Sequence, residues 1–275
     1  MSIRLVLAFL YGSGFFWSGL AYAAPEPVAQ TNVTEVRTAT DENIKDVFLA
    51  PGWGKLSFEA PAAGTYQLPP LEPAAGGQVL DTSGKLQELD SYLGAKPTLL
   101  SFIYRTCDDV NGCPLSTMVL YTVAKRIAEE PALQDQLRLL TLSFDPLGDI
   151  PEAMAEYKES ILGKADLDWD FLTTTSETEL QPILSAYQQS VVKDKTSEDG
   201  KGKFSHILRV FLIDTEKQIR NIYSLSFLHP DILVNDIKTL ILEQANLSVK
   251  HQEKPNLNQK VSEKDNDLFA DKVDK

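Results

Sequence analysis

The chain has 275 residues, of which 43% are hydrophobic and 24% charged, a composition typical of a globular protein. Its 15 glycines, its 2 cysteines and the lack of sustained heptads exclude the collagen-like, disulfide-rich and coiled-coil classes. The formal net charge of −13 disfavours contact with nucleic-acid phosphates and with anionic membrane surfaces, so we expect no nucleic-acid partner.

Residues 1–23 have the pattern of an export signal. Arg4 gives a short positive start, an apolar stretch follows, and Ala21-Tyr22-Ala23 forms a small-x-small cleavage site before Ala24. Glycines and serines interrupt the apolar stretch, which is shorter than the about 20 residues that a bilayer span needs. The pattern predicts a periplasmic protein without membrane insertion after cleavage; a protein tethered by an uncleaved signal is the alternative.

Two segments flank the strongest sequence pattern. Residues 24–77 are predicted to be a polar linker, up to about residue 46, and then a turn-rich extension with a short strand candidate at Lys55–Phe58. Residues 246–275 contain few apolar side chains and balanced charges, so we predict a disordered tail.

Residues 78–245 alternate strand-like and helix-like segments. Short apolar runs predict buried strands at Thr98–Tyr104, Leu137–Phe144 and Trp169–Thr173. Helical spacing predicts helices at Pro114–Glu130, from Asp149, as the cap, to about Leu162, at Glu177–Tyr187 and at Asp231–Glu243. Residues 188–205 are predicted to be a loop, and His206–Ile213 and Gln218–Tyr223 a hairpin. This order predicts an α/β fold of thioredoxin-like type around a mainly parallel sheet.

Cys107 and Cys113 are the two cysteines of the chain, and they lie between a predicted buried strand and a predicted helix. Pro114 suits a first helical turn, which places Cys113 at the N-terminus of the helix. The helix dipole at that end lowers the pKa of a thiol, whereas the carboxylates of Asp108 and Asp109 raise it. The pattern alone leaves three uses open: a structural disulfide, a redox dithiol and a metal site.

The three histidines differ in their surroundings. His251 lies in the predicted tail. His229 precedes Pro230 at a predicted helix start, so we expect it to be a surface or capping residue. His206 opens the predicted strand HILRVFLID, which we expect beside the strand that leads to the cysteines. Two thiolates and one imidazole form a soft set of few ligands that suits Cu(I), whereas structural zinc usually takes four protein ligands. A buried, hydrogen-bonded histidine is the alternative.

Three motifs occur in one order along the chain. The strand Leu99–Tyr104 with the loop Cys107–Pro114 looks like "FxYTxCxxxCP", and Ser143–Asp149 is similar to "SxDPxxD". His206, eight residues before Asp214, matches the histidine of "DHSxxxYLID". On these motifs residues 76–245 resemble the Sco/SenC family of copper-binding thioredoxin-like proteins.

The resemblance implies that Cys107, Cys113 and His206 bind copper. It implies a role in assembling the copper centre of cytochrome c oxidase, as a copper donor or as a thiol reductant of the target. It also places Asp145 near the metal, where its carboxylate would meet a partner or orient His206; the alternative is that Asp145 only terminates its strand.

The chain departs from the family pattern in the spacing of its cysteines. Five residues separate Cys107 from Cys113, where the family usually has three. Asn111-Gly112 is a flexible turn that can absorb the extra length. Ser205, rather than a proline, precedes His206, which argues against a general disulfide oxidoreductase.

Three functions therefore remain as hypotheses. The first is an exported copper chaperone that serves the copper-site subunit of cytochrome c oxidase or another exported redox protein. The second is a thiol–disulfide reductase in which Cys107 attacks and Cys113 resolves the mixed disulfide. The third is a binding module that a structural disulfide stabilises.

Overall fold

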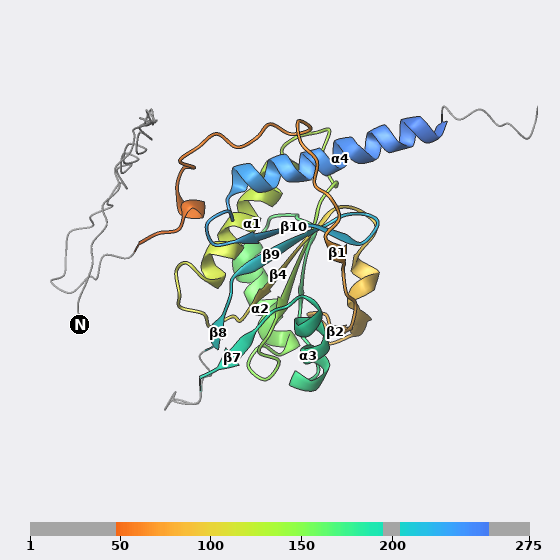
Figure 1. Cartoon of the computed structure of the whole chain (residues 1–275). Coiled ribbons are helices and arrows are strands. Elements are labelled where there is room, and N and C mark those ends of the chain that lie inside the picture. Colours follow the sequence, from red (N-terminus) through yellow and green to blue (C-terminus); the bar gives the residue numbers. More distant parts are fainter. Residues whose placement is uncertain (1–47, 195–203, 253–275) are drawn as a thin grey trace, which may run out of the picture. The chain divides into compact units, whose positions relative to one another are not determined.

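The computed structural model describes residues 48–194 and 204–252 (Figure 1). The predicted signal peptide, the polar linker and most of the predicted tail lie outside the described residues. No helix within the described ranges is both long enough and apolar enough to cross a membrane.

A central sheet organises the described part of the chain, in the order β1-β10-β9-β4-β5-β6. Its strands are β1 (Glu72–Pro73), β4 (Thr98–Ile103), β5 (Arg138–Ser143), β6 (Trp169–Leu172), β9 (Arg209–Ile213) and β10 (Gln218–Ser224). Two small hairpins lie beside it: β2 (Gln78–Leu80) with β3 (Leu86–Glu88), and β7 (Val191–Lys193) with β8 (Phe204–His206). β4 is buried along its whole length, as its uninterrupted apolar run predicts.

The sheet is mixed, so the prediction of a mainly parallel sheet is wrong. β4 pairs with β5, and β5 with β6, in parallel, whereas β9 runs antiparallel to β4 and β10 antiparallel to β9. After β6 the chain passes through α3 and the β7–β8 hairpin, and it then enters β9 in the direction opposite to β4. Ser101 pairs with Val210 and Thr98 with Ile213.

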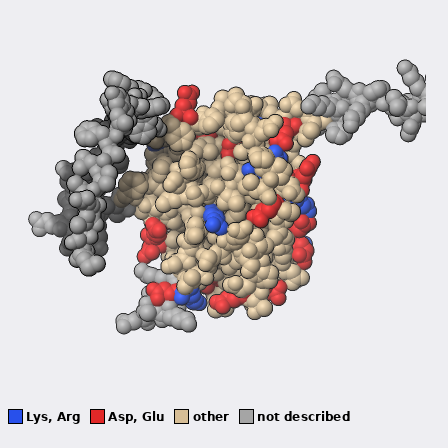
Figure 2. All heavy atoms as spheres, in the orientation of Figure 1, with Lys and Arg blue, Asp and Glu red and all other residues tan. Residues whose placement is uncertain are grey.

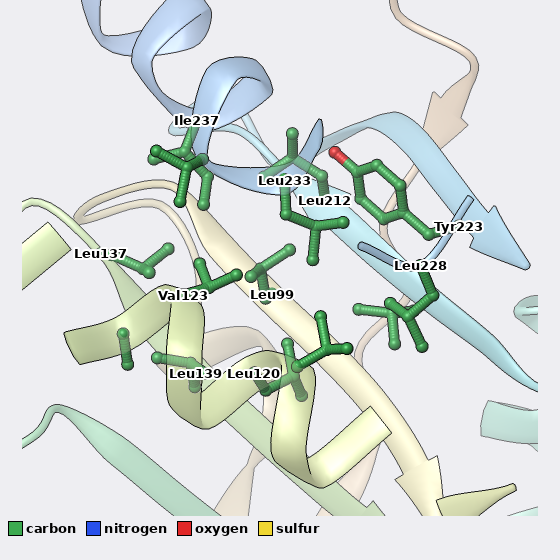
Figure 3. Close-up of a cluster of buried hydrophobic side chains, with 14 of the residues drawn as sticks. Leu99, Leu120, Val123, Leu137, Leu139, Leu212, Tyr223, Leu228, Leu233 and Ile237 are labelled. Atoms are coloured by element: carbon green, nitrogen blue, oxygen red, sulfur yellow. The ribbon is translucent and has the colours of Figure 1, made fainter. Parts of the chain in front are cut away.

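Helices cover both faces of the sheet. They are α1 (Cys113–Ala128), α2 (Pro151–Leu162), α3 (Glu177–Ala186) and α4 (Pro230–Gln252), with two 3-10 turns, η1 (Pro51–Trp53) and η2 (Leu89–Tyr92). Alternate residues of β4 point to opposite faces. Leu99 packs with α1 and α4, whereas Leu100 packs with α3 and the β2–β3 hairpin. Figure 3 shows the first of these clusters, to which Leu99 of β4, Val123 of α1 and Leu233 of α4 all belong.

Most predicted elements are confirmed to within a few residues, and four are corrected. Lys55–Phe58 is not a strand, because the prolines and glycines around it favour turns, and η1 forms just before it. The predicted loop at 188–205 contains β7 and most of β8. His206 ends β8 instead of opening β9, since residues 207–208 separate the two strands. The last helix continues to Gln252, into the predicted tail.

The turn-rich extension is packed against the domain. Ala50 belongs to the buried cluster beneath α1 and α4, and Leu68 accepts a hydrogen bond from the Arg220 side chain. Arg220 also pairs with Asp214 at 2.7 Å and with Glu243 at 2.8 Å. These contacts attach the extension to β10 and α4.

On the face seen in Figure 2, charged groups lie mainly toward the edges and acidic ones predominate.

A substitution at Gly52 tests how tightly the extension packs against the rest of the domain. A Cβ atom there would lie 2.4 Å from the Leu228 carbonyl oxygen and 2.9 Å from a Leu115 methyl carbon. We expect Gly52→Ala to lower the free energy of unfolding by about 1–3 kcal/mol, the usual cost of overpacking, as measured by urea denaturation. Gly54→Ala is the control, because its Cβ would meet nothing nearer than 4.0 Å. Equal stability of the two variants would contradict the packing.

Candidate functional site

The loop between β4 and α1 carries both cysteines, and a series of short turns shapes it. Cys107 N–H donates to the Tyr104 carbonyl at 3.2 Å, and Gly112 N–H to the Asp109 carbonyl at 2.8 Å. The Asp109 side chain accepts from Asn111 N–H at 3.0 Å. Cys113 then begins α1, as predicted. The loop thus returns the chain so that its two ends lie close together.

The structure brings all three residues of the predicted site together. Both cysteines are free thiols, Cys107 partly buried and Cys113 2% exposed. Cys113 Sγ lies 3.7 Å from His206 Nε2, within hydrogen-bond distance for sulfur. Cys107 lies close enough to Cys113 and His206 for both side chains to lower the pKa of its thiol. Among the described residues, however, no group of three His, Cys, Asp or Glu side chains is already arranged to hold a metal ion.

The two thiols have opposite acidities. The hydrogen bond from Cys113, with a smaller contribution from His206, lowers the pKa of Cys107 to about 4 against the opposing effect of burial. The same hydrogen bond, together with burial, raises the pKa of Cys113. One proton is therefore held on Cys113 and shared with Cys107, so at neutral pH the pair carries one thiolate, on the more exposed sulfur.

Gly112 permits the close approach of the loop ends. A Cβ atom at this position would lie 3.2 Å from Cys107 Sγ and 3.2 Å from the Asp109 carbonyl oxygen. A side chain would therefore press on the sulfur. The turn predicted at Asn111-Gly112 is present, and a side chain at Gly112 would require its neighbours to shift by a few tenths of an ångström.

His206 is positioned by the β7–β8 hairpin and by an aromatic cluster. It pairs with Val191 across the hairpin, and its ring centroid lies 4.7 Å from that of Phe144. Phe144 in turn contacts the rings of Tyr104 and Phe204 at 5.4 and 5.5 Å. The buried Nδ1 atom of His206 has no hydrogen-bond partner in the described part of the chain. The ring is therefore oriented by packing, with Nε2 toward the sulfurs.

A groove of about 410 Å³ opens beside the cysteines. Its lining joins the Cys loop to α1 and α2 and is largely apolar or aromatic, formed by Arg105, Cys107, Cys113, Pro114, Thr117, Met118, Tyr121, Tyr157, Ser160 and Ile161. The sulfur of Cys107 is thus reachable from outside through a shaped surface.

Asp145 and Asp149 occupy different surroundings. Asp145 is partly buried, and its carboxylate accepts from Gly148 N–H at 3.2 Å, within its own turn. Asp149 is 1% exposed and accepts from Arg105 N–H at 2.9 Å and from the Ser143 hydroxyl at 2.6 Å. Burial raises the pKa of Asp149. Asp149 therefore joins the end of β5 to the start of the Cys loop.

The prediction of Asp149 as a helix cap is wrong, because Ile150 occupies the cap position of α2 and Asp149 turns inward. Sequence reasoning missed its contact with the Cys loop. The "SxDPxxD" pattern contained the signal, since its serine and second aspartate are the two side chains that join. His229 is only 3% exposed, which corrects its predicted placement at the surface. Its Nδ1 accepts a hydrogen bond from Asp231 N–H at 3.1 Å, as the side chain of a capping residue does.

The fold and this site define a class: a thioredoxin-like protein with two free thiols and a histidine at one edge of the sheet. The family model described as SCO1/SenC matches residues 77–242. The chain therefore belongs to the SCO1/SenC family.

Known relatives agree with this assignment. The chain is 25% identical over 157 residues to the SCO1 protein homolog of Bacillus subtilis (strain 168), covering 57% of this chain and 76% of the relative. It is similar to Bradyrhizobium japonicum ScoI with copper bound, at 25% identity and a TM-score of 0.51, covering 61% and 99% of the two chains. It also has the fold of Arabidopsis thaliana ScoI with copper bound, at 20% identity and a TM-score of 0.54, covering 62% and 98%.

The low pKa of Cys107 predicts its reactivity in the metal-free protein. A thiol of ordinary pKa loses roughly fifty-fold or more in alkylation rate between pH 8 and pH 6. We expect Cys107 to react with iodoacetamide at nearly the same rate at both, because its pKa of about 4 lies below both. Peptide mass spectrometry measures the rate for each cysteine. Cys113→Ala removes the donor, so the steep pH dependence should return; a steep dependence in the unaltered protein would contradict the assignment.

The two aspartates provide a matched pair of variants. We expect Asp149→Ala to lower the free energy of unfolding by about 1–3 kcal/mol, because it leaves buried donors from Arg105 and Ser143 unsatisfied. Asp145→Ala should have a smaller effect, since its carboxylate bonds only within an exposed turn. Denaturant melts of both variants measure the difference, and a larger loss in Asp145→Ala would refute this reading.

Proposed function

We propose that this protein binds copper through Cys107, Cys113 and His206 and delivers it to the copper centre of cytochrome c oxidase. The observation that carries the proposal is the convergence of the three side chains: Cys113 Sγ lies 3.7 Å from His206 Nε2, and Cys107 lines the same groove as Cys113. They come from two segments that are distant in sequence.

The donor set fits copper as a cargo. Two sulfurs and one imidazole are soft ligands that suit Cu(I). The thiolate of Cys107 is present at neutral pH, so the site needs to release only the proton of Cys113 when it binds the metal. His206 Nδ1 makes no hydrogen bond to a described residue, so the polar contact of the ring is the one that Nε2 makes with Cys113 Sγ. The described side chains lie close together but are not yet arranged to hold an ion, so metal binding requires them to adjust.

A copper-bound relative and the export pattern support the proposed copper binding and the proposed periplasmic location. Bradyrhizobium japonicum ScoI, 25% identical, was solved with copper bound. The export pattern in residues 1–23 supports a periplasmic location, cleaved or tethered, where the copper-site subunit of the oxidase or another exported redox protein would accept the metal.

Copper affinity tests the proposal. We expect the reduced protein to bind one Cu(I) per chain, and His206→Ala to weaken binding at least about tenfold by removing one of three ligands. Competition with a chromophoric Cu(I) chelator under anaerobic conditions measures both. His251→Ala, at the end of α4, is the control and should bind as the unaltered protein does.

Oxidation provides a second control, because a Cys107–Cys113 disulfide removes both thiolates and should abolish binding. Unchanged affinity in His206→Ala would refute the three-ligand site.

A thiol–disulfide reductase is the second candidate, favoured by the asymmetry of the thiols. The accessible Cys107 thiolate would attack a partner disulfide, forming a mixed disulfide and releasing one partner thiolate. Cys113, once deprotonated, would attack Cys107 Sγ, releasing the second partner thiolate and leaving an intramolecular disulfide. The partner gains two electrons, and this protein loses two.

Cys113→Ser should trap the mixed disulfide, because the resolving thiol is missing. Cys107→Ser should trap much less, since Cys113 is buried. Non-reducing gels with a purified oxidised copper-site subunit measure the adduct, and equal trapping by both variants would contradict the assigned roles. If the double Cys→Ser variant retained biological function, both candidates would fail, and a binding module would remain.

A further inference from the structure

Residues 48–54, the N-terminal strap, contact the Cys loop directly through three hydrogen bonds. Ala50 N–H donates to Asn111 Oδ1 at 2.8 Å, and Asn111 Nδ2 donates to the Phe48 carbonyl at 2.7 Å. Trp53 Nε1 donates to the Val110 carbonyl at 3.1 Å. All three bonds reach the middle of the loop, at Val110 and Asn111.

The strap is itself firmly held. Ala50 is 2% exposed, and Gly52 is buried against Leu115 of α1 with no room for a Cβ atom. The Trp53 ring packs on the same buried cluster, and His229 Nε2 lies 3.2 Å from the Gly54 carbonyl. The strap is therefore a fixed surface, attached to α1 and to the start of α4, against which the loop lies.

Between the two cysteines, the turn at Asp109 shapes the loop. The turn at Asp109 supplies one backbone and one side-chain hydrogen bond, to Gly112 and Asn111. With five residues between the cysteines, the sulfurs can adopt many separations unless the loop is fixed from outside, because each additional free residue adds conformational entropy. The Asn111 side chain fixes the loop to the strap, because it accepts a hydrogen bond from one strap residue and donates a hydrogen bond to another.

We infer that Asn111 and Trp53 are positioning residues, which hold the Cys107–Cys113 loop against the strap so that the two sulfurs lie together beside His206. Neither residue touches the metal or a partner thiol in this scheme; each acts through the loop. The inference rests on the proposed function for its copper readout, whereas its redox readout depends only on the two thiols.

Two quantities should respond. Loss of one hydrogen bond between the loop and the strap should lower the Cu(I) affinity about tenfold, because the loop must then be ordered as the metal binds. The same loss should also lower the effective concentration that one cysteine thiol has relative to the other. A tenfold decrease makes the reduction potential of the disulfide about 30 mV less negative for this two-electron couple.

The experiment compares four variants in the full chain: Asn111→Ala, Trp53→Phe, Asn111→Asp and Asn235→Ala. Trp53→Phe keeps an aromatic ring and removes the N–H donor, while Asn111→Asp keeps the acceptor for Ala50 and removes the donor to Phe48. Asn235→Ala is the control, because Asn235 Nδ2 donates to the Pro61 carbonyl at 2.9 Å and so ties the extension to α4, away from the loop.

Equilibration with glutathione gives the potential, chelator competition gives the Cu(I) affinity, and urea melts give the stability of each variant. We expect both quantities to shift in Asn111→Ala and Trp53→Phe, to shift less in Asn111→Asp, and to stay unchanged in Asn235→Ala. If the loop variants matched Asn235→Ala in potential and affinity, the positioning role would be overturned, whatever their stability.

The two proposals fail separately. If the unaltered protein bound no Cu(I) but Asn111→Ala still shifted the potential, the copper function would fail and the positioning role would stand. If Cu(I) bound tightly in every variant and the potential stayed constant, the positioning role would fail and the copper function would stand.

Discussion

The site depends on the pairing of β9 with β4 in opposite directions. β4 ends at Ile103, where the Cys loop begins, and β9 begins at Arg209, shortly after His206. Since antiparallel neighbours place the end of one strand beside the start of the other, His206 arrives at the same edge of the sheet as the two cysteines. A parallel β9 would have carried the histidine to the opposite edge. The antiparallel direction of β9 thus brings the imidazole to the end of β4 where the two thiols lie.

The parallel half of the sheet contributes in a complementary way. β4 and β5 run in the same direction, so their carboxyl ends meet, and the turn after β5 reaches the Cys loop. Asp149 makes this contact through Arg105, and Phe144 supports the His206 ring. Buried polar and aromatic contacts therefore fix both sides of the site. The reactive sulfur of Cys107 is left beside an apolar groove, where another molecule can reach it.

The shared proton of the thiol pair relates the two candidate functions. A thiolate on the accessible sulfur is a metal ligand in one and a nucleophile in the other, and the buried thiol supplies the proton that stabilises it. Oxidation of the same pair removes the thiolates that copper needs. The two proposed functions, metal binding and thiol exchange, are thus alternative uses of one chemical group, and both would depend on the loop that carries the sulfurs.

The local elements and the identities of the reactive residues could be read from the amino-acid sequence. The apolar run at Thr98–Tyr104, the proline after Cys113 and the spacing of the motifs predicted the buried strand, the helix start and the family, because these depend on neighbours in the chain. The direction of β9, the inward turn of Asp149 and the contact of Asn111 with Phe48 and Ala50 became visible in the folded chain alone. Each joins segments far apart in sequence, and hydrophobic periodicity carries no information about which distant backbone group a polar side chain will meet.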